Sequence, residues 1–205
     1  MEIGESTIIA TDDVPAEALN SLVSELSGVV RVNKVQRIVQ LSVLPPSWVK
    51  FVFDHPEWLL LGPALWAFLK EFGGQLGKNL ADKLFNLPKQ PEGYDEVQVE
   101  HAVERFIDAL VRLKERVAER TEVAAALLLP NGEHVGLQLE VTDRSAAALS
   151  LAKFAALVSA IQAKVQSELE AGRQIEEPVL VLGSDDSVTM KWIDPGTGED
   201  HEARL

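Results

Sequence analysis

The chain lacks several residues and motifs that catalytic and metal sites use. It contains no cysteine, which excludes disulfide bonds, thiolate metal ligands and a cysteine nucleophile. No serine lies in a G-x-S-x-G motif, and the glycine-rich stretch 73–78 does not follow the order of a phosphate-binding loop. We therefore expect a protein that is not an enzyme and that carries no cofactor.

Basic charge is scarce. The chain has 19 Lys and Arg against 32 Asp and Glu, which gives a formal net charge of −13. Nucleic-acid binding requires clustered basic residues, so this balance argues against it and favours a basic protein partner. The acids are unevenly placed, because residues 1–87 carry a net charge of −3 and residues 88–205 carry −10.

Long apolar runs are also lacking. The longest uncharged apolar run, residues 58–69, has 12 residues, whereas a bilayer-spanning helix needs about 20. The N-terminal stretch 1–13 has no basic region followed by an apolar run, the pattern typical of a secretory signal. The sequence predicts a cytoplasmic protein.

Hydrophobic periodicity predicts an α+β fold, with long amphipathic helices packed on small, mostly antiparallel sheets. In the first half we expect a strand at 7–10, a helix over 15–27 that Asp12 or Asp13 caps, β structure over 29–43 and a turn of helix in 45–53. The capping box Asp54-x-x-Glu57 predicts a helix over 54–86, which Pro63 should kink.

Residues 88–93 indicate a linker between parts 1–87 and 94–205, which form either two units or one compact unit. The second part predicts the order helix, hairpin, helix, meander. Apolar residues four and three apart from Val99 to Val117 indicate the first helix, and Asn131-Gly132 indicates the tight turn of the hairpin. A second helix follows over 144–171, and three strands then run to the C-terminus.

Aromatic residues are concentrated in one segment, since residues 48–85 hold eight of the chain's twelve. Glycine inside a helix costs about 1 kcal/mol relative to alanine, so the glycines there suggest close approach of another element. Three interpretations remain open: a core helix, a surface for a partner or for self-association, and a membrane-interface helix. The candidate surface residues are Trp58, Trp66, Phe68, Phe72, Gly73 and Gly77.

The acidic C-terminal part supplies a second candidate surface. From residue 170 to the end there are nine acids and three bases. A basic partner should therefore bind there. The candidate residues are Glu176, Glu177, Asp185, Asp186, Asp200 and Glu202.

The leading functional hypothesis is a non-enzymatic protein–protein interaction module that regulates or inhibits a basic partner, by analogy with small acidic proteins that neutralise a basic toxin or nuclease. One alternative is a membrane-associating effector that uses residues 54–86. Another is a metal-dependent hydrolase built from scattered carboxylates and His101. His101 and Glu104 lie one helical turn apart, but a solvated helix face explains them, and we predict no metal site.

Overall fold

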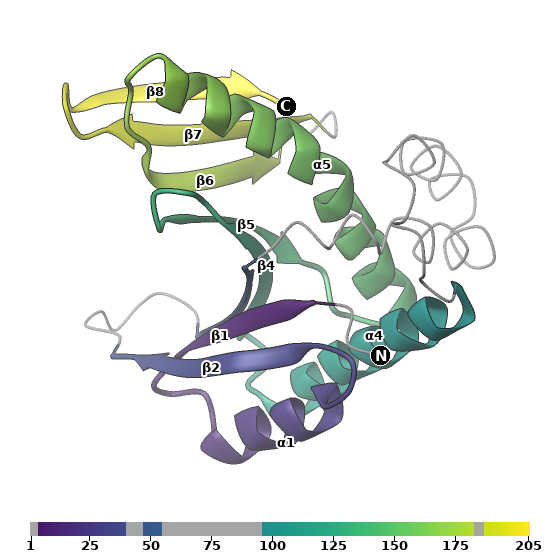
Figure 1. Ribbon diagram of the computed structural model, residues 1–205. Coiled ribbons are helices and arrows are strands. Elements are labelled where there is room, and N and C mark those ends of the chain that lie inside the picture. The colour runs from purple at the N-terminus through teal and green to yellow at the C-terminus, as the bar shows by residue number, and fades with distance from the viewer. Residues whose placement is uncertain (1–3, 40–46, 55–95, 183–186) are drawn as a thin grey trace.

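The structure is a computed structural model that describes residues 4–39, 47–54, 96–182 and 187–205 (Figure 1). These residues form helices and two mostly antiparallel sheets, of five and three strands, which confirms the α+β prediction. The elements are β1 (Glu5–Thr11), α1 (Ala16–Leu26), β2 (Arg31–Ile38), β3 (Trp48–Phe53), α4 (Glu96–Arg116), β4 (Glu122–Leu128), β5 (His134–Leu139), α5 (Arg144–Glu170), β6 (Glu176–Leu182), β7 (Val188–Asp194) and β8 (Glu199–Arg204).

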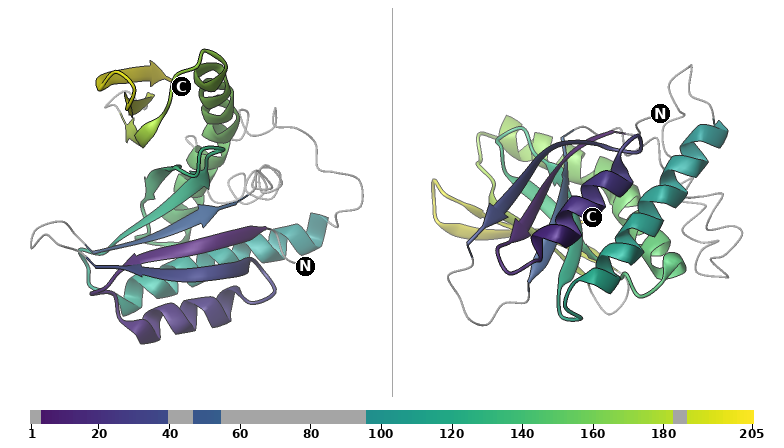
Figure 2. Two further views of the ribbon diagram at one scale, coloured as in Figure 1. Left: turned by 60° about the vertical axis from the view of Figure 1, so that its left-hand side comes forward. Right: turned by 90° about the horizontal axis from the view of Figure 1, so that it is seen from below.

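The larger sheet has the strand order β2-β1-β3-β4-β5. Its parallel pairs are β1 with β2 and β3 with β4, while β1/β3 and β4/β5 are antiparallel. Parallel strands need a crossover connection, and α1 lies between β1 and β2 in the chain as α4 lies between β3 and β4. The two helices lie side by side on one face of the sheet (Figure 2).

Strands from both predicted parts of the chain belong to this sheet, because β3 pairs with β4 along its whole length. One continuous core also joins α1 and β1 to α4 and α5. The predicted linker, residues 88–93, lies outside the described residues, so the division into two units stays a prediction.

The smaller sheet, β6-β7-β8, is an antiparallel meander at the C-terminus, as the sequence predicts. Its strand β6 lies beside β5, and the Asn131 side chain donates to the Ile175 carbonyl at 2.7 Å across this junction. Met190 and Trp192 from β7 belong to the same core as α5. One side of both sheets therefore faces α5, and the opposite face of the C-terminal sheet is turned outward (Figure 1).

The centre of the core is aromatic. Phe51 and Phe53 from β3 are fully buried, and Phe106 from α4 meets them edge-on at ring distances of 5.6 and 6.2 Å. Such edge-to-face contacts add to the free energy gained from burying the rings. The four-and-three spacing of α4 is confirmed, since its apolar residues Val99, Val103, Phe106, Leu110 and Leu113 are all buried.

Helix α5 is the long helix expected after the hairpin. The Asp143 carboxylate accepts from the Ala146 N–H at 2.9 Å and so caps its start, and Gly172, with φ 73°, follows its end. The predicted apolar residues face inward and are buried: Leu151, Phe154, Val158, Ile161 and Val165.

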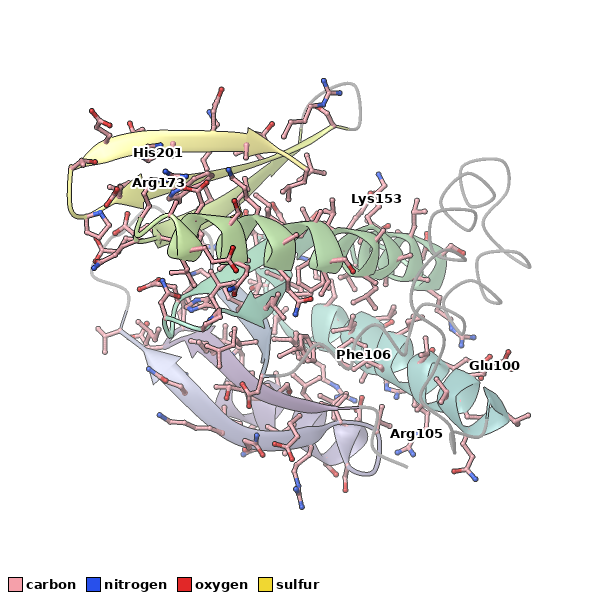
Figure 3. The ribbon with its side chains drawn as sticks, turned by 45° about the horizontal axis from the view of Figure 1, so that its top comes forward. Glu100, Arg105, Phe106, Lys153, Arg173 and His201 are labelled. Atoms are coloured by element: carbon pink, nitrogen blue, oxygen red, sulfur yellow. The ribbon has the colours of Figure 1, made fainter. Side chains whose placement is uncertain are left out.

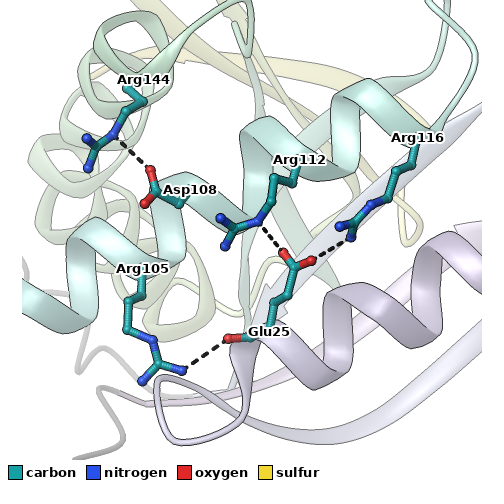
Figure 4. A network of polar contacts seen from close by, with 6 residues as sticks. All are labelled: Glu25, Arg105, Asp108, Arg112, Arg116 and Arg144. Atoms are coloured by element: carbon teal, nitrogen blue, oxygen red, sulfur yellow. Dashed lines mark hydrogen bonds and ion pairs between the residues drawn. The ribbon is translucent and has the colours of Figure 1, made fainter.

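Ion pairs join α1, α4 and α5 along their polar sides (Figure 4). Glu25 at the end of α1 accepts from Arg112 Nε at 2.8 Å and from Arg116 Nη1 at 2.6 Å. Burial by itself would raise the pKa of Glu25, but these two hydrogen bonds outweigh it and lower the pKa. On the other side of α4, Asp108 pairs with Arg144 of α5 at 2.8 Å. Helix α4 is therefore tied to both neighbouring helices.

The prediction of a helical turn in 45–53 was wrong. Residues 48–53 form β3, and Val49, Phe51 and Phe53 point into the core while Trp48, Lys50 and Val52 point to the other face. The composition of this stretch fits either structure. Pairing with β1 on one side and β4 on the other satisfies the backbone hydrogen bonds and favours the strand.

The cap of α1 and the β4–β5 turn also differ from the sequence prediction. Helix α1 follows Pro15 and has no side-chain cap, because the Asp13 carboxylate accepts from the Ser47 hydroxyl instead, which lowers the pKa of Asp13. At the β4–β5 turn only Gly132 has a positive φ, of 87°. The turn is a three-residue loop closed by a hydrogen bond from Leu129 N to Glu133 O, and it does not have the two-residue form that needs two positive φ angles.

Candidate functional site: the outer face of the C-terminal sheet

The structure describes four of the twelve residues predicted to form a surface. The aromatic and glycine candidates of segment 54–86 (Trp58, Trp66, Phe68, Phe72, Gly73 and Gly77) lie outside the described residues, as do Asp185 and Asp186. The helix start at the capping box lies outside them too. Glu176 and Glu177 on β6 and Asp200 and Glu202 on β8 are described, and all four are exposed. The described part of the predicted surface is thus the C-terminal sheet.

Strand pairing brings acids from β6 and β8 to one face. Ile193 in the central strand is paired with Glu176 on one side and with Asp200 on the other. Because side chains alternate along a strand, these three residues point away from buried Trp192 and away from α5. Lys191 lies on the same outward face and is paired with Val179 and Glu202.

We call this surface the acidic face. It consists of Glu176, Glu177, Val179, Val181, Lys191, Ile193, Asp200 and Glu202. Its apolar part is open to solvent, since Val179 and Val181 are 51% and 43% exposed. Lys191 is the base among these residues, and its Nζ lies 3.3 Å from the Glu202 carboxylate; Arg204, paired with Thr189, is a second base on the same side of the sheet. Both side chains of that pair are at least half exposed, so the pair adds little to stability and its groups can exchange partners.

A β-bulge in β6 lies beside a hollow in this face. Glu176 pairs with Ile193 and Val179 pairs with Lys191, so residues 177 and 178 both lie opposite Trp192. Glu177 has a φ of 46°, the one positive value for a non-glycine residue among the described residues. A hollow of about 450 Å³ lies here. Its lining residues are Glu177, Val179, Lys191, Trp192, Ile193, Asp200, His201 and Glu202.

Trp192 and His201 also line the hollow, but their side chains lie on the side of the sheet that faces α5, and each carries a polar atom that has no hydrogen bond within the described part of the chain. Trp192 and His201 stack at a ring distance of 5.6 Å, and both Trp192 Nε1 and His201 Nε2 are buried and unpartnered there. Lys164 Nζ of α5 lies 5.3 Å from the Trp192 ring. Figure 3 shows His201 and Arg173 at this end of the molecule, where α5 ends beside the C-terminal sheet.

Sequence reasoning found the acids but missed the apolar and basic residues beside them. Val179, Val181, Lys191 and Ile193 were not singled out. The alternation in PVLVL and SVTMKWI could have placed them on one face, because a strand sends every second side chain to the same side. The bulge has no comparable signal beyond Pro178, which is common at irregular strand positions.

Two other regions hold chemically interesting groups but form no assembled site. On the face of the larger sheet opposite α1 and α4, Lys50 Nζ lies 5.1 Å from the Trp48 ring, and burial lowers the pKa of Lys50. His101 on α4 is exposed and its Nδ1 contacts the Val97 carbonyl at 2.8 Å. Within the described ranges, no group of three or more His, Cys, Asp or Glu side chains is arranged to hold a metal ion.

One described helix, α5, is long and apolar enough by length and composition to cross a bilayer. Of its most apolar stretch, 44% is buried inside the molecule. Core helices meet the same criterion, and α5 packs on β4 and β5. Its composition therefore does not by itself indicate a membrane segment.

Comparison with known proteins identifies no relative. No family model matches the chain, and no curated protein and no solved structure matches it significantly. A functional assignment must therefore rest on the residues and geometry of this chain.

Proposed function

We propose that the protein is a non-enzymatic protein–protein interaction module that binds a basic partner through the acidic face and thereby regulates or inhibits that partner. The observation that carries the proposal is the hollow at the β6 bulge. Three predicted acids, Glu177, Asp200 and Glu202, line it together with Val179 and Ile193. Carboxylates beside exposed apolar side chains suit a partner that presents a lysine or arginine next to an apolar residue.

The charge of the chain also supports binding of a basic partner. The formal net charge of −13 would attract a basic protein from a distance and raise its association rate at low salt. The local carboxylates would then fix its orientation. Lys191 pairs with Glu202 in the unbound protein, and a partner's cation can replace it without breaking a buried interaction.

Binding of a defined basic probe tests this proposal. The probe is a ten-residue peptide that alternates lysine or arginine with leucine, and its control is the same peptide with glutamate in place of each base. The triple variant Glu177→Gln/Asp200→Asn/Glu202→Gln should bind the basic peptide about tenfold more weakly than the wild type, a loss of about 1.4 kcal/mol. Fluorescence anisotropy of a labelled peptide measures the affinity.

A matched control separates the acidic face from net charge. Glu104, Glu115 and Glu119 are exposed, and the first two lie on α4 while the third follows it. Changing these three to glutamine alters the net charge by the same amount as the first triple variant. The control should retain the wild-type affinity. If both triple variants weaken binding equally, the interaction depends only on overall charge and the proposed site is wrong.

A further inference from the structure

One edge strand of each sheet is exposed. Strand β2 ends the larger sheet and β8 ends the smaller one. Seven of the eight residues of β2 are exposed, and along β8 exposed and half-buried residues alternate from Asp200 onward. No described strand pairs with the outer edge of either. An exposed edge strand presents backbone donors and acceptors to any extended chain that can align with it.

Two backbone hydrogen bonds at the ends of β2 define which of its backbone groups point outward. Arg31 N donates to Gly4 O, and Ile38 O accepts from Asp12 N. In a parallel ladder, residues that bond to the neighbouring strand alternate with residues that point away. With the observed register, this alternation turns Val35 and Arg37 to the outer edge.

The side chains of β2 make this edge basic and β-branched. Arg31, Lys34 and Arg37 are its charged residues, and it carries no acid. Arg31 is paired with Glu5 at 3.0 Å, and Arg37 donates to the Val14 carbonyl at 2.7 Å. Two of the three charges are thus held by the rest of the chain. Val35 is 39% exposed, so a partner strand would also cover apolar surface.

Strand β8 is acidic and therefore complements the basic strand β2 in charge. Leu205 N donates to Val188 O, and the alternation of an antiparallel ladder then turns the backbone of Asp200 and Glu202 to the outer edge. This strand contains the acids Glu199, Asp200 and Glu202 against the single base Arg204. Strand β8 therefore has a net charge of −2, opposite in sign to the +3 of β2.

We propose that the outer edge of β2 pairs with the outer edge of β8 in a second copy of this chain. This contact continues the sheet of one molecule into the next and places acids opposite bases. Pairing β2 with β2, or β8 with β8, would place like charges opposite one another, which destabilises a strand pair. The contact does not depend on the basic partner of the proposed function, because it uses backbone edges and the basic strand β2.

The geometry of this contact defines its behaviour in solution. Two different surfaces meet, so a pair of molecules keeps one unused β2 edge and one unused β8 edge, and association proceeds to rings or open chains. A contact of one strand on another is small and therefore weak. Repulsion between copies with a net charge of −13 opposes it at low salt, while high salt weakens the local ion pairs. Association should thus be greatest at intermediate ionic strength.

Two proline variants test the contact. Val35→Pro and Glu202→Pro each remove an outward N–H and leave the inner ladder in place. Sedimentation velocity at about 10–500 µM covers the range in which a small interface associates. The wild-type sedimentation coefficient should rise with concentration, and each variant alone should remain monomeric. An equimolar mixture should form a dimer and nothing larger, because each variant retains the edge that the other lacks.

Several outcomes would overturn the proposal: a wild type that stays monomeric throughout, a variant that still associates like the wild type, or a mixture that stays monomeric. Circular dichroism and thermal melting check that both variants fold. If either proline variant unfolds, the charge-reversed variants Lys34→Glu and Asp200→Lys replace them. Each alone should associate more weakly than the wild type, and their equimolar mixture should associate more strongly than either alone, because the two reversed strands are again complementary. A variant that associates as strongly as the wild type, or a mixture that associates no more than either variant alone, would overturn the proposal. Val35→Pro leaves the acidic face intact, so loss of self-association without loss of basic-peptide binding separates this inference from the proposed function.

Discussion

Glu168 offers a direct test of how the end of α5 is stabilised. The residue is only 2% exposed, yet its carboxylate lies between two cations. Its Oε2 accepts from Arg173 Nε at 2.5 Å, and its Oε1 accepts from Lys164 Nζ at 2.6 Å. The hydrogen bond from Arg173 is the largest influence on the carboxyl group. Together with Lys164 it outweighs burial and lowers the pKa of Glu168 to about 2.

The lowered pKa sets an upper limit on how much the Glu168 carboxylate contributes to the free energy of unfolding. A drop from 4.5 to about 2 corresponds to an upper limit of about 3 kcal/mol, since one pKa unit is about 1.36 kcal/mol. The side chains of Lys164 and Arg173 are 31% and 43% exposed, so solvent screens part of the interaction. We therefore expect Glu168→Gln, which keeps the shape and removes the charge, to lower the free energy of unfolding by about 1–2 kcal/mol at pH 7.

The dependence on pH distinguishes the charge from packing. A carboxyl group whose pKa is lower in the folded state stabilises the fold fully above its unfolded pKa, near 4.5, and loses this contribution as the pH falls toward 2. The difference between wild type and Glu168→Gln should therefore shrink to roughly half at about pH 3.5. Urea denaturation at both pH values, followed by circular dichroism, measures it.

Glu170→Gln is the matched control, because Glu170 lies on the same helix, is exposed and accepts from the neutral Gln166 amide at 2.8 Å. It should change the stability by less than about 0.5 kcal/mol. The reasoning fails if Glu168→Gln is as mild as this control at pH 7, or if its effect is the same at both pH values.

Three further predictions concern other parts of the fold. Gly136→Ala should lower the free energy of unfolding by about 1–3 kcal/mol in urea denaturation, because the added Cβ would lie 2.9 Å from the Ala125 carbonyl oxygen; unchanged stability would contradict this. Glu25→Gln should cost about 1 kcal/mol at low salt and less at about 1 M salt, because its arginine partners are 45% and 38% exposed; equal losses at both salt concentrations would refute the ion-pair explanation. An NMR titration should give a pKa below 6.5 for His134, since burial and then the charge of Lys50 lower it, and Lys50→Met should raise that pKa; an unchanged value would exclude the coupling.

Helix faces and local turns were predictable because they depend on neighbours in sequence. The spacing from Val99 to Leu113 and the alternation from Val135 to Val141 identified buried residues correctly. Gly172 was correctly expected at the end of α5. At Asp13 the local pattern failed, because Ser47, far away in the sequence, competes for the carboxylate that would have capped α1.

At the acidic face, too, some features could be predicted from the sequence and others depend on the tertiary structure. Alternation along β6 and β8 is a property of the sequence, and it sends Glu176, Asp200 and Glu202 to one side of their strands. That these side chains meet across β7, and that the bulge at Glu177 hollows the surface between them, follows only from the register of the three strands.

The sequence alone determined the acidity of the chain, the α+β class and the inward face of most helices and strands, because charge and hydrophobic period are local properties. Only the tertiary structure decided that 48–53 is a strand and that β3 pairs in parallel with β4. Only it could show that a basic strand, β2, and an acidic strand, β8, are left at the two ends of the sheets. Strand neighbours are chosen by hydrogen bonds and burial between residues far apart in the chain, and no short stretch of sequence contains that information.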